Sequence, residues 1–359
     1  MASTEGSPVP EKVEVTKRPV ELLGKELKAF LHRLKYDDVH VMKTASAKYE
    51  SRDVHVEQAV NRIFDDEVTV GRISHEERAL VGKMIPYACR CAKWFYFHFS
   101  SELKVVLGLF TTLVARIDDL CTEVPTTMIP EIQRSILNWG SGDNPHQIHA
   151  HLAHLQRVVQ TEMPKYYGPV VSALIIVSTI EFLVGCTMES LVPKGFACPK
   201  RFPGYLRDKS GLGETYAYFM FPEQMFPEAK WLETYLSAIP DLALFINRMN
   251  DILTYYKESL DLDDENTYMK TMSRALGCSA MDVFRSSCEG QLALIPEITA
   301  TLSWSEDLLQ AWSSFRDGYI FWHLHEKRIS RGGDVHGGDV YGGGVIGGDF
   351  LQDFIAVDS

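Results

Sequence analysis

The stretch N-D-I-L-T-Y-Y-K-E, residues 250–258, lies inside a segment that otherwise has the apolar spacing of a helix. In this stretch Asn250, Thr254 and Glu258 follow one another at intervals of four residues. Each interval turns an α-helix by about 400°, so the three side chains drift only about 40° per step and share one face. Amide, hydroxyl and carboxylate oxygens are hard ligands, which suit Mg²⁺ better than Zn²⁺ or copper. The stretch indicates either a line of metal ligands or the polar face of a solvated helix.

The surrounding residues favour the line of metal ligands. The preceding segment D-L-A-L-F-I-N-R-M (241–249) and the internal I-L-T-Y-Y are too apolar for a fully exposed helix. Polar groups in such a segment are costly to bury unless they are satisfied. Lys257 adds a cation beside them that can reach an anionic substrate.

A second acidic cluster occupies residues 116–123, R-I-D-D-L-C-T-E, where Asp118, Asp119 and Glu123 end an apolar helical segment. Acids at a helix C-terminus oppose the helix dipole. Two unit charges about 4 Å apart repel by about 4 kcal/mol at an effective dielectric near 20, and a divalent cation relieves that repulsion. Alone, the cluster is equally compatible with a solvated helix end. Combined with residues 250–258, it indicates Mg²⁺ at the mouth of an apolar cavity, where the metal triggers departure of diphosphate from a prenyl chain.

The chain as a whole is predicted to be all-α and single-domain, with roughly ten or more helices. Strand signals are nearly absent, because no alternation is sustained and no Asn-Gly turn occurs. Ser74 and Glu77 resemble a capping box that opens one of the helices. The expected helices lie at 20–34, 54–66, 77–99, 101–121, 127–139, 146–162, 169–190, 228–259, 266–276, 280–299 and 304–329.

The two ends of the chain differ from its middle. Residues 1–18 are polar and proline-containing and are expected to form a disordered leader, whereas 331–359 form a Gly- and Asp-rich tail expected to be disordered. Residues 19–330 are long enough for one large helical domain. The most apolar run, V-V-S-A-L-I-I-V-S-T-I-E-F-L-V-G-C, contains Glu181 and is expected to be a buried helix. With no signal peptide visible, we expect a cytoplasmic protein without stable membrane insertion.

The net charge limits the binding partners that we expect, and the cysteine pattern indicates the redox state of the thiols. The formal net charge of −12 argues against nucleic acid and anionic membranes, although local cations can still hold an anionic substrate. Seven scattered cysteines without a C-x-x-C pair suit reduced thiols.

Four ordered motifs resemble those of class I terpene cyclases, specifically the fungal trichodiene synthase family. The segments D-D-L-C-T-E (118–123) and N-D-I-L-T-Y-Y-K-E (250–258) are similar to the family's two metal-binding motifs. F-P-G-Y-L-R-D-K-S-G-L-G (202–213) resembles the segment that carries the diphosphate-sensing arginine. G-Y-I-F-W-H-L-H-E-K-R (318–328) resembles the family's last helix. The likeness covers roughly residues 75–330 and is highly specific.

The resemblance implies a terpene cyclase domain over 19–330, a helical bundle around a deep apolar cavity, and a role for each matching residue. Three Mg²⁺ ions are expected on Asp118, Asp119, Glu123, Asn250, Thr254 and Glu258, with Asp119 and Glu123 supporting through hydrogen bonds. The residues expected to bind diphosphate are Arg207, Lys257 and Arg328, and those linking the sensor to the reacting carbon are Ser210 and Gly211. The aromatic residues expected to stabilise carbocations in the cavity are Phe182, Tyr319 and Trp322.

The implied activity is a Mg²⁺-dependent sesquiterpene cyclase, which ionises farnesyl diphosphate and releases diphosphate and a polycyclic hydrocarbon or alcohol. Two departures from the family pattern, Thr122 in place of an acid and Ile329 in place of tyrosine, set the chain apart from a trichodiene producer. A longiborneol-type cyclase fits equally well. The alternatives are a prenyl chain-elongating transferase, which typically needs two Asp-rich motifs, and a non-enzymatic helical binding protein. A homodimer is an expectation from the resemblance alone.

Other conspicuous residues have simpler interpretations. The aromatic run W-F-Y-F-H-F (94–99) and Cys186 are expected to pack in the core. Arg248 is expected to be a structural ion-pair partner. Four histidines have metal-like spacing but no visible carboxylate partner, and are expected on a surface helix: His146, His149, His151 and His154.

Overall fold

A computed structural model describes residues 12–49, 54–139, 148–260 and 266–325, and this part of the chain contains helices and no strand. The first helices are α1 (Lys12–Arg33), α2 (Asp38–Tyr49), α3 (Val54–Thr69), α4 (His75–Phe95), α5 (Ser101–Glu123), α6 (Pro125–Leu137) and α7 (Ala150–Arg157). The others are α8 (Pro169–Leu191), α9 (Phe202–Ser210), α10 (Gly213–Tyr218), α11 (Glu228–Leu260), α12 (Tyr268–Leu276), α13 (Ala280–Leu302) and α14 (Glu306–His325). The all-α prediction is confirmed.

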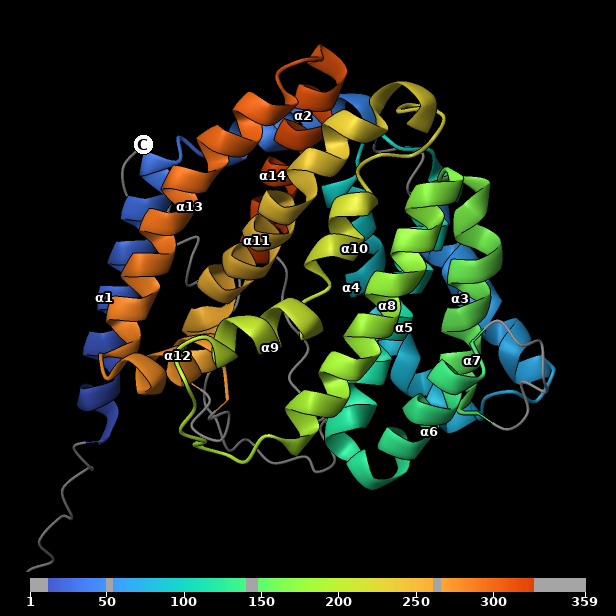
Figure 1. Ribbon diagram of the computed structural model, residues 1–359, viewed down its shortest axis with the longest axis horizontal. Coiled ribbons are helices and arrows are strands. Elements are labelled where there is room, and N and C mark those ends of the chain that lie inside the picture. The colour runs from blue at the N-terminus through green and yellow to red at the C-terminus, as the bar shows by residue number, and fades with distance from the viewer. Residues whose placement is uncertain (1–11, 50–53, 140–147, 261–265, 326–359) are drawn as a thin grey trace, which may run out of the picture.

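Six of these helices form a closed ring of neighbours, in the order α4, α5, α8, α10, α11 and α14, with α14 packing back on α4. The remaining long helices lie outside the ring: α3 packs on α4 and α5, whereas α13 packs on α11 (Figure 1). The short helix α9 runs across from α12 to α8 and also contacts α11 (Figure 1). The ring therefore places the two acidic motifs, on α5 and α11, in helices that face each other across the bundle.

The interior of the ring is aromatic. Phe95 on α4 lies against Tyr216 of α10 and against Tyr319 and Trp322 of α14, with ring centroids 6.1, 4.7 and 5.4 Å apart. The packing expected for residues 94–99 is borne out, because four of them are buried: Phe95, Tyr96, Phe97 and Phe99. Aromatic side chains bury large apolar areas and hold specific edge-to-face geometries, which stabilises the ring.

Local signals explain most of the helix starts. Ser74 caps α4, because its Oγ accepts a hydrogen bond from the backbone N–H of Glu77 at 3.0 Å. The Glu77 side chain, however, does not complete the expected capping box. Its carboxylate is instead hydrogen-bonded to Arg116 of α5 and His151 of α7. A full capping box occurs at Ser279, the N-cap of α13.

The short helices α2, α9 and α10 were not predicted from the sequence. Their segments lack the long apolar period, and Pro203 and Gly211 suggested a connection, although proline is well accommodated in a first helical turn. α1 begins at Lys12, so the end of the leader expected over 1–18 is helical. The helix expected over 146–162 begins at Ala150 and passes into a π-helical turn after Arg157.

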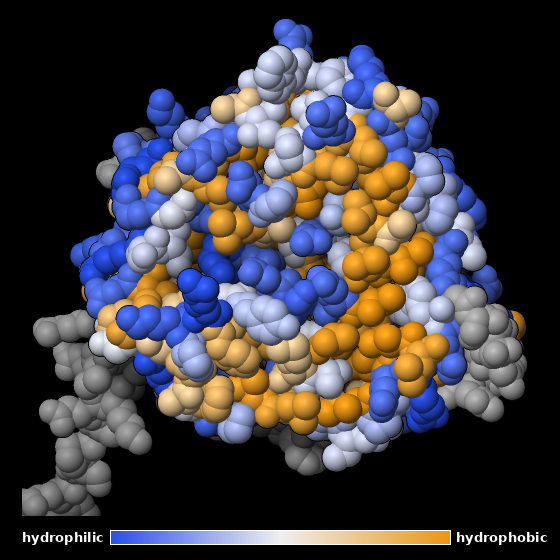
Figure 2. Space-filling model, in the orientation of Figure 1, coloured by the Kyte–Doolittle hydropathy of each residue, from blue (hydrophilic) through white to orange (hydrophobic). Residues whose placement is uncertain are grey.

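α8 differs from the prediction that it is buried on most sides. It is the single helix of the described residues that is long and apolar enough to cross a bilayer, and only half of its most apolar window is buried. Figure 2 shows apolar residues gathered over α8 on the face that it shares with α9. The large exposed apolar residues of α8 are Val170, Val177, Val184 and Leu191.

Candidate active site

The metal-type line on α11 is present in the structure as a continuous helix. Thr254 donates its hydroxyl proton to the carbonyl oxygen of Asn250 at 2.8 Å, one turn earlier. This leaves the hydroxyl lone pairs of Thr254 as acceptors or metal ligands. The backbone of Lys257 and Glu258 continues α11, but their side chains lie outside the described residues, as does all of Arg328.

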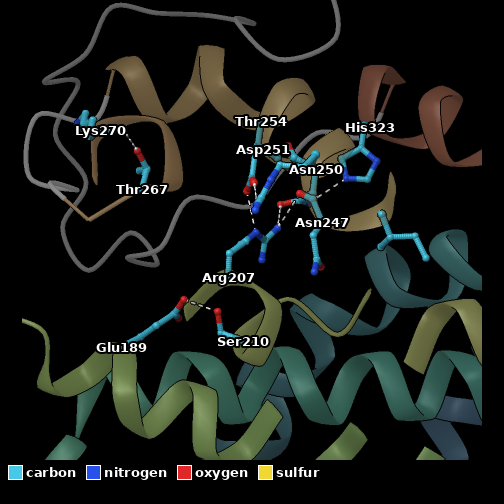
Figure 3. Close-up of polar contacts among 12 residues, drawn as sticks. Glu189, Arg207, Ser210, Asn247, Asn250, Asp251, Thr254, Thr267, Lys270 and His323 are labelled. Atoms are coloured by element: carbon cyan, nitrogen blue, oxygen red, sulfur yellow. Dashed lines mark hydrogen bonds and ion pairs between the residues drawn. The ribbon is translucent and has the colours of Figure 1, made fainter. Parts of the chain in front are cut away.

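Arg207, in the last turn of α9, reaches across to this line. Its Nη2 donates to Asn250 Oδ1 at 2.8 Å and its Nε to Asp251 Oδ1 at 2.7 Å (Figure 3). Burial disfavours the charged guanidinium, but the negative charges of Asp251 and Glu189 and the hydrogen bond to Asp251 together raise the pKa of Arg207 above its usual value. The structure therefore holds a permanently charged arginine beside a predicted metal ligand.

Asp251 is the anchor of this arrangement, and sequence reasoning did not assign it a role. Its second oxygen accepts from Arg248 Nη1 at 3.1 Å. The Arg248 guanidinium lies 3.8 Å from the centre of the Tyr268 ring. The expectation that Arg248 is a structural ion-pair partner is confirmed. The sequence does contain a signal for this role. Asp251 follows Arg248 by three residues, and it lies about 100° around the helix from Asn250, off the face of the predicted metal ligands.

Ser210 and Gly211 form the link between α9 and α10. Ser210 donates to a carboxylate oxygen of Glu189 on α8 (Figure 3). A Cβ on Gly211 would stand 2.2 Å from Asn247 Oδ1 and 2.7 Å from Arg207 O. Only glycine lets the backbone approach α11 so closely. Next to it, Leu212 has a left-handed φ of 55°, which breaks the helix between α9 and α10.

The first acidic cluster meets α8. Asp118 Oδ1 lies 3.9 Å from Cys186 Sγ, and Ser190 donates to the carbonyl oxygens of Cys121 and Cys186 at 3.1 and 2.8 Å. Contact with Cys121 and burial both raise the pKa of Cys186, so it stays a thiol. Cys186 thus packs in the core as expected, but against the predicted metal ligand. Asp119 is half-buried at the same helix end.

These contacts bring both clusters to one end of the ring. The C-terminal half of α8 carries Cys186, beside Asp118, and also Glu189, which Ser210 joins to α9. From α9, Arg207 continues the connection to Asn250. Among the described side chains no group of three or more His, Cys, Asp or Glu is close enough to hold a metal ion. A metal ion beside Asn250 and Thr254 would be held by their amide and hydroxyl oxygens.

Glu123, the last residue of the acidic cluster, belongs to an ion-pair network with Arg116 and Glu77. Its Oε2 accepts from Arg116 Nη1 at 2.9 Å, and Arg116 Nε donates to Glu77 Oε1 at 2.7 Å. His151 Nε2 lies 2.7 Å from the same Glu77 oxygen, and His151 is 1% exposed. The surface-helix prediction for the histidines is therefore wrong for His151 and for His154, which is 6% exposed. The carboxylate partner of His151 comes from α4, distant in sequence. His146 lies outside the described residues.

The three predicted cavity aromatics are all buried. Tyr319 and Trp322 belong to the aromatic interior, and the Tyr319 hydroxyl donates to Ile246 O at 3.0 Å. The ring of Tyr319 is thereby fixed beside α11. Phe182 stands on the buried face of α8, 4% exposed.

Comparison with known proteins places these features in a family. The chain matches the family described as "Trichodiene synthase (TRI5)" over residues 18–332. It is 28% identical over 232 residues to the (E)-beta farnesene synthase of Metarhizium brunneum, covering 63% of this chain and 67% of that protein. It is 31% identical over 182 residues to terpene synthase BipA of Cochliobolus sativus, covering 48% and 55%. The match thus spans about half the length of BipA.

A solved structure of a cucumene synthase variant has a similar fold, with a TM-score of 0.50 at 11% identity, covering 77% of this chain and 96% of that one. At this identity the likeness concerns the fold alone.

Proposed function

Because the chain belongs to the trichodiene synthase family of terpene synthases, we propose that it is a Mg²⁺-dependent sesquiterpene cyclase. Its substrate is farnesyl diphosphate, which it ionises and cyclises with release of diphosphate. The observation that carries the proposal is Arg207, a half-buried and charged guanidinium 2.8 Å from the amide oxygen of Asn250. An anion-binding group and a hard-metal ligand side by side, at one end of an aromatic interior, suit an apolar substrate with a diphosphate head.

The donor atoms at this end fit Mg²⁺. They are oxygens of an amide, a hydroxyl and carboxylates, with no sulfur or imidazole ligand required. Asn250 and Thr254 would hold one ion together with Glu258, and Asp118 would hold the others, supported by Asp119 and Glu123. When bound, the ions neutralise the diphosphate charge and so make it a better leaving group.

The chain's own residues supply the rest of the mechanism. Arg207 binds the diphosphate oxygens, and Asp251 keeps that arginine charged and aimed at the α11 face. Lys257 and Arg328 are proposed as further diphosphate ligands. The rings of Tyr319 and Trp322 exclude water and offer π faces to the carbocation. The Tyr319 hydroxyl donates its proton to Ile246 O, which fixes its ring beside α11.

The Gly211 backbone lies close to Asn247 of α11 and to the carbonyl oxygen of Arg207. Because Gly211 follows Ser210, which is bonded to Glu189, movement of Arg207 toward diphosphate would shift the α9–α10 turn. We assign Ser210 and Gly211 to relaying that movement to the reacting carbon. Phe182 lines the same interior from α8. The product is a polycyclic sesquiterpene hydrocarbon or alcohol, with a longiborneol-type skeleton as one candidate.

Product analysis tests the proposed function. Purified protein is incubated with farnesyl diphosphate and Mg²⁺, and the extract is separated by gas chromatography with mass detection. Cyclic C15 products are expected. A longer prenyl diphosphate formed after addition of isopentenyl diphosphate would support the elongating transferase instead. No turnover of farnesyl, geranyl or geranylgeranyl diphosphate would leave the binding-protein alternative.

We further propose that the protein forms a cytoplasmic homodimer through α8. Val170, Val177, Val184 and Leu191 recur every seven residues and are between 40% and 66% exposed. A seven-residue apolar repeat is typical of a helix that packs along another helix. In an antiparallel two-fold pair, Val177 would meet Val184 of the second copy, as an isologous interface requires.

Charge also favours a second copy over a lipid surface as the partner of α8. Glu181 on this helix is paired with Lys209 of the same chain at 2.6 Å, so two copies bring no unpaired charges together there. A lipid-binding helix needs a basic polar face, which α8 lacks. Val177→Glu is expected to convert the dimer to a monomer in sedimentation velocity, whereas Trp304→Glu, at an exposed position between α13 and α14, leaves it unchanged. A monomeric wild-type protein would contradict the dimer.

A further inference from the structure

His323, on α14, makes a pair of polar contacts that fix the state of its ring. Nδ1 lies 2.8 Å from the carbonyl oxygen of Tyr319, which can only accept a hydrogen bond. Nδ1 therefore carries the proton, and in the neutral ring Nε2 is an acceptor. That Nε2 lies 3.1 Å from Asn250 Nδ2, on the neighbouring helix α11. His323 is only 6% exposed, so water does not compete freely for these bonds.

The contact with His323 determines which way the Asn250 amide points. Asn250 Nδ2 donates to His323, and Asn250 Oδ1 accepts from Arg207 Nη2 at 2.8 Å (Figure 3). A reversed amide would set its oxygen against the Nε2 lone pair and its NH₂ against the guanidinium. Both hydrogen bonds would be lost, so the two partners together select one orientation.

Packing holds the imidazole ring itself in place. Its centroid is 4.3 Å from that of Tyr319 and 4.6 Å from that of Trp322, and Phe95 lies parallel to it at 6.3 Å. The ring is thus clamped by the aromatic interior on one side and bonded to α11 on the other. A rotation that removed Nε2 from Asn250 would have to displace these aromatic side chains.

We propose that His323 is a positioning residue that holds the Asn250 amide oxygen toward Arg207 and the proposed Mg²⁺–diphosphate site. The proposal rests on the proposed function of that site. Partners of a metal-ligating side chain orient it, and losing them typically lowers metal affinity by about 10- to 100-fold. His323 acts through Asn250 and touches neither substrate nor metal, so its effect is expected on metal binding first.

Two substitutions separate the hydrogen bond from the packing. His323→Phe keeps an aromatic ring but removes the acceptor, whereas the side-chain oxygen of His323→Gln can accept from Asn250 Nδ2. His325→Phe is the matched control, because His325 lies in the same turn but contacts Asp38, at 3.4 Å, instead of α11. Folding of each variant is checked by circular dichroism.

The measurement is thermal stabilisation by Mg²⁺ with saturating inorganic diphosphate, titrated in Mg²⁺, followed by kcat and KM for farnesyl diphosphate. We expect His323→Phe to raise the Mg²⁺ concentration at half-effect by about 10- to 100-fold. We expect His323→Gln and His325→Phe to stay within about threefold of wild type. A lower kcat with little change in KM should accompany the first variant.

The outcomes distinguish this inference from the proposed function. A His323→Phe protein that binds Mg²⁺ like wild type would overturn the positioning role, and so would a His323→Gln protein as impaired as His323→Phe. Absence of any Mg²⁺–diphosphate effect in the wild-type protein would instead contradict the proposed metal site, and the inference with it. If His323→Phe does not fold, the comparison of His323→Gln with His325→Phe decides, and a loss above tenfold in the former would refute the hydrogen-bond role.

Discussion

Replacing the buried Asp251 by asparagine removes the charge that holds two half-buried arginines in place. Asp251 accepts from Arg207 at 2.7 Å and from Arg248 at 3.1 Å, and the side chains of the two arginines are only 18% and 13% exposed. The asparagine oxygen can accept from one guanidinium, but its NH₂ then faces the other. Breaking a buried ion pair typically costs about 3–5 kcal/mol. Because both arginines keep some contact with water, we expect the lower end, about 3 kcal/mol.

Urea denaturation measures this loss, as a lower midpoint at unchanged slope. Glu233→Gln, an exposed carboxylate on the same helix, is the control and should change the unfolding free energy by less than about 0.5 kcal/mol. The kinetic consequence is separate: Arg207 loses its anchor, so KM for farnesyl diphosphate is expected to rise by more than tenfold, about 1.4 kcal/mol. If Asp251→Asn unfolds at the wild-type urea concentration with unchanged KM, Asp251 does not anchor the diphosphate clamp.

Two further predictions concern the α9–α10 turn and the Glu77 network. Gly211→Ala puts a Cβ against Asn247 and Arg207 O and should lower the unfolding free energy, measured by urea denaturation, by about 1–3 kcal/mol. The control is Gly290→Ala, which has open space around its Cβ and should be neutral or stabilising. Equal effects of the two substitutions would contradict the close approach of Gly211 to α11. Burial alone would raise the pKa of Glu77, but hydrogen bonds from His151 and Arg116 hold it at about 2. Since that pKa lies below the usual 4.5, the stabilisation by Glu77 is present above about pH 4.5 and is lost as the pH falls toward 2. Glu77→Gln should flatten the fall in unfolding free energy over that window, and an unchanged pH profile would refute the assignment.

The sequence predicted the long helices well because their apolar periods repeat over several turns. It also selected Asn250, Thr254 and Arg207 for the site, and the structure brings Arg207 to Asn250. The short helices α9 and α10 escaped prediction because nine and six residues cannot show a period. The spacing of apolar residues alone does not predict α9, because its contacts with α8, α11 and α12 hold it in place.

Roles that depend on partners distant in sequence could not be predicted. The importance of Asp251 comes from its contact with α9, and that of His323 from its contact with α11; the spacing around residue 250 reveals neither. The same reason accounts for the wrong prediction at His151, whose carboxylate partner lies on α4. Residues 326–329, where the family pattern is altered, lie outside the described part of the chain.

We propose that the oxygen ligands on α5 and α11 trigger loss of diphosphate. Diphosphate release from farnesyl diphosphate tests this role, measured at saturating Mg²⁺ for the wild type, Asp118→Ala and Asn250→Ala. We predict release by the wild type and a loss of at least a thousandfold, about 4 kcal/mol, in both variants, each with a wild-type circular dichroism spectrum and melting temperature. Near-normal release by either folded variant would contradict the assignment of that residue to the metal site.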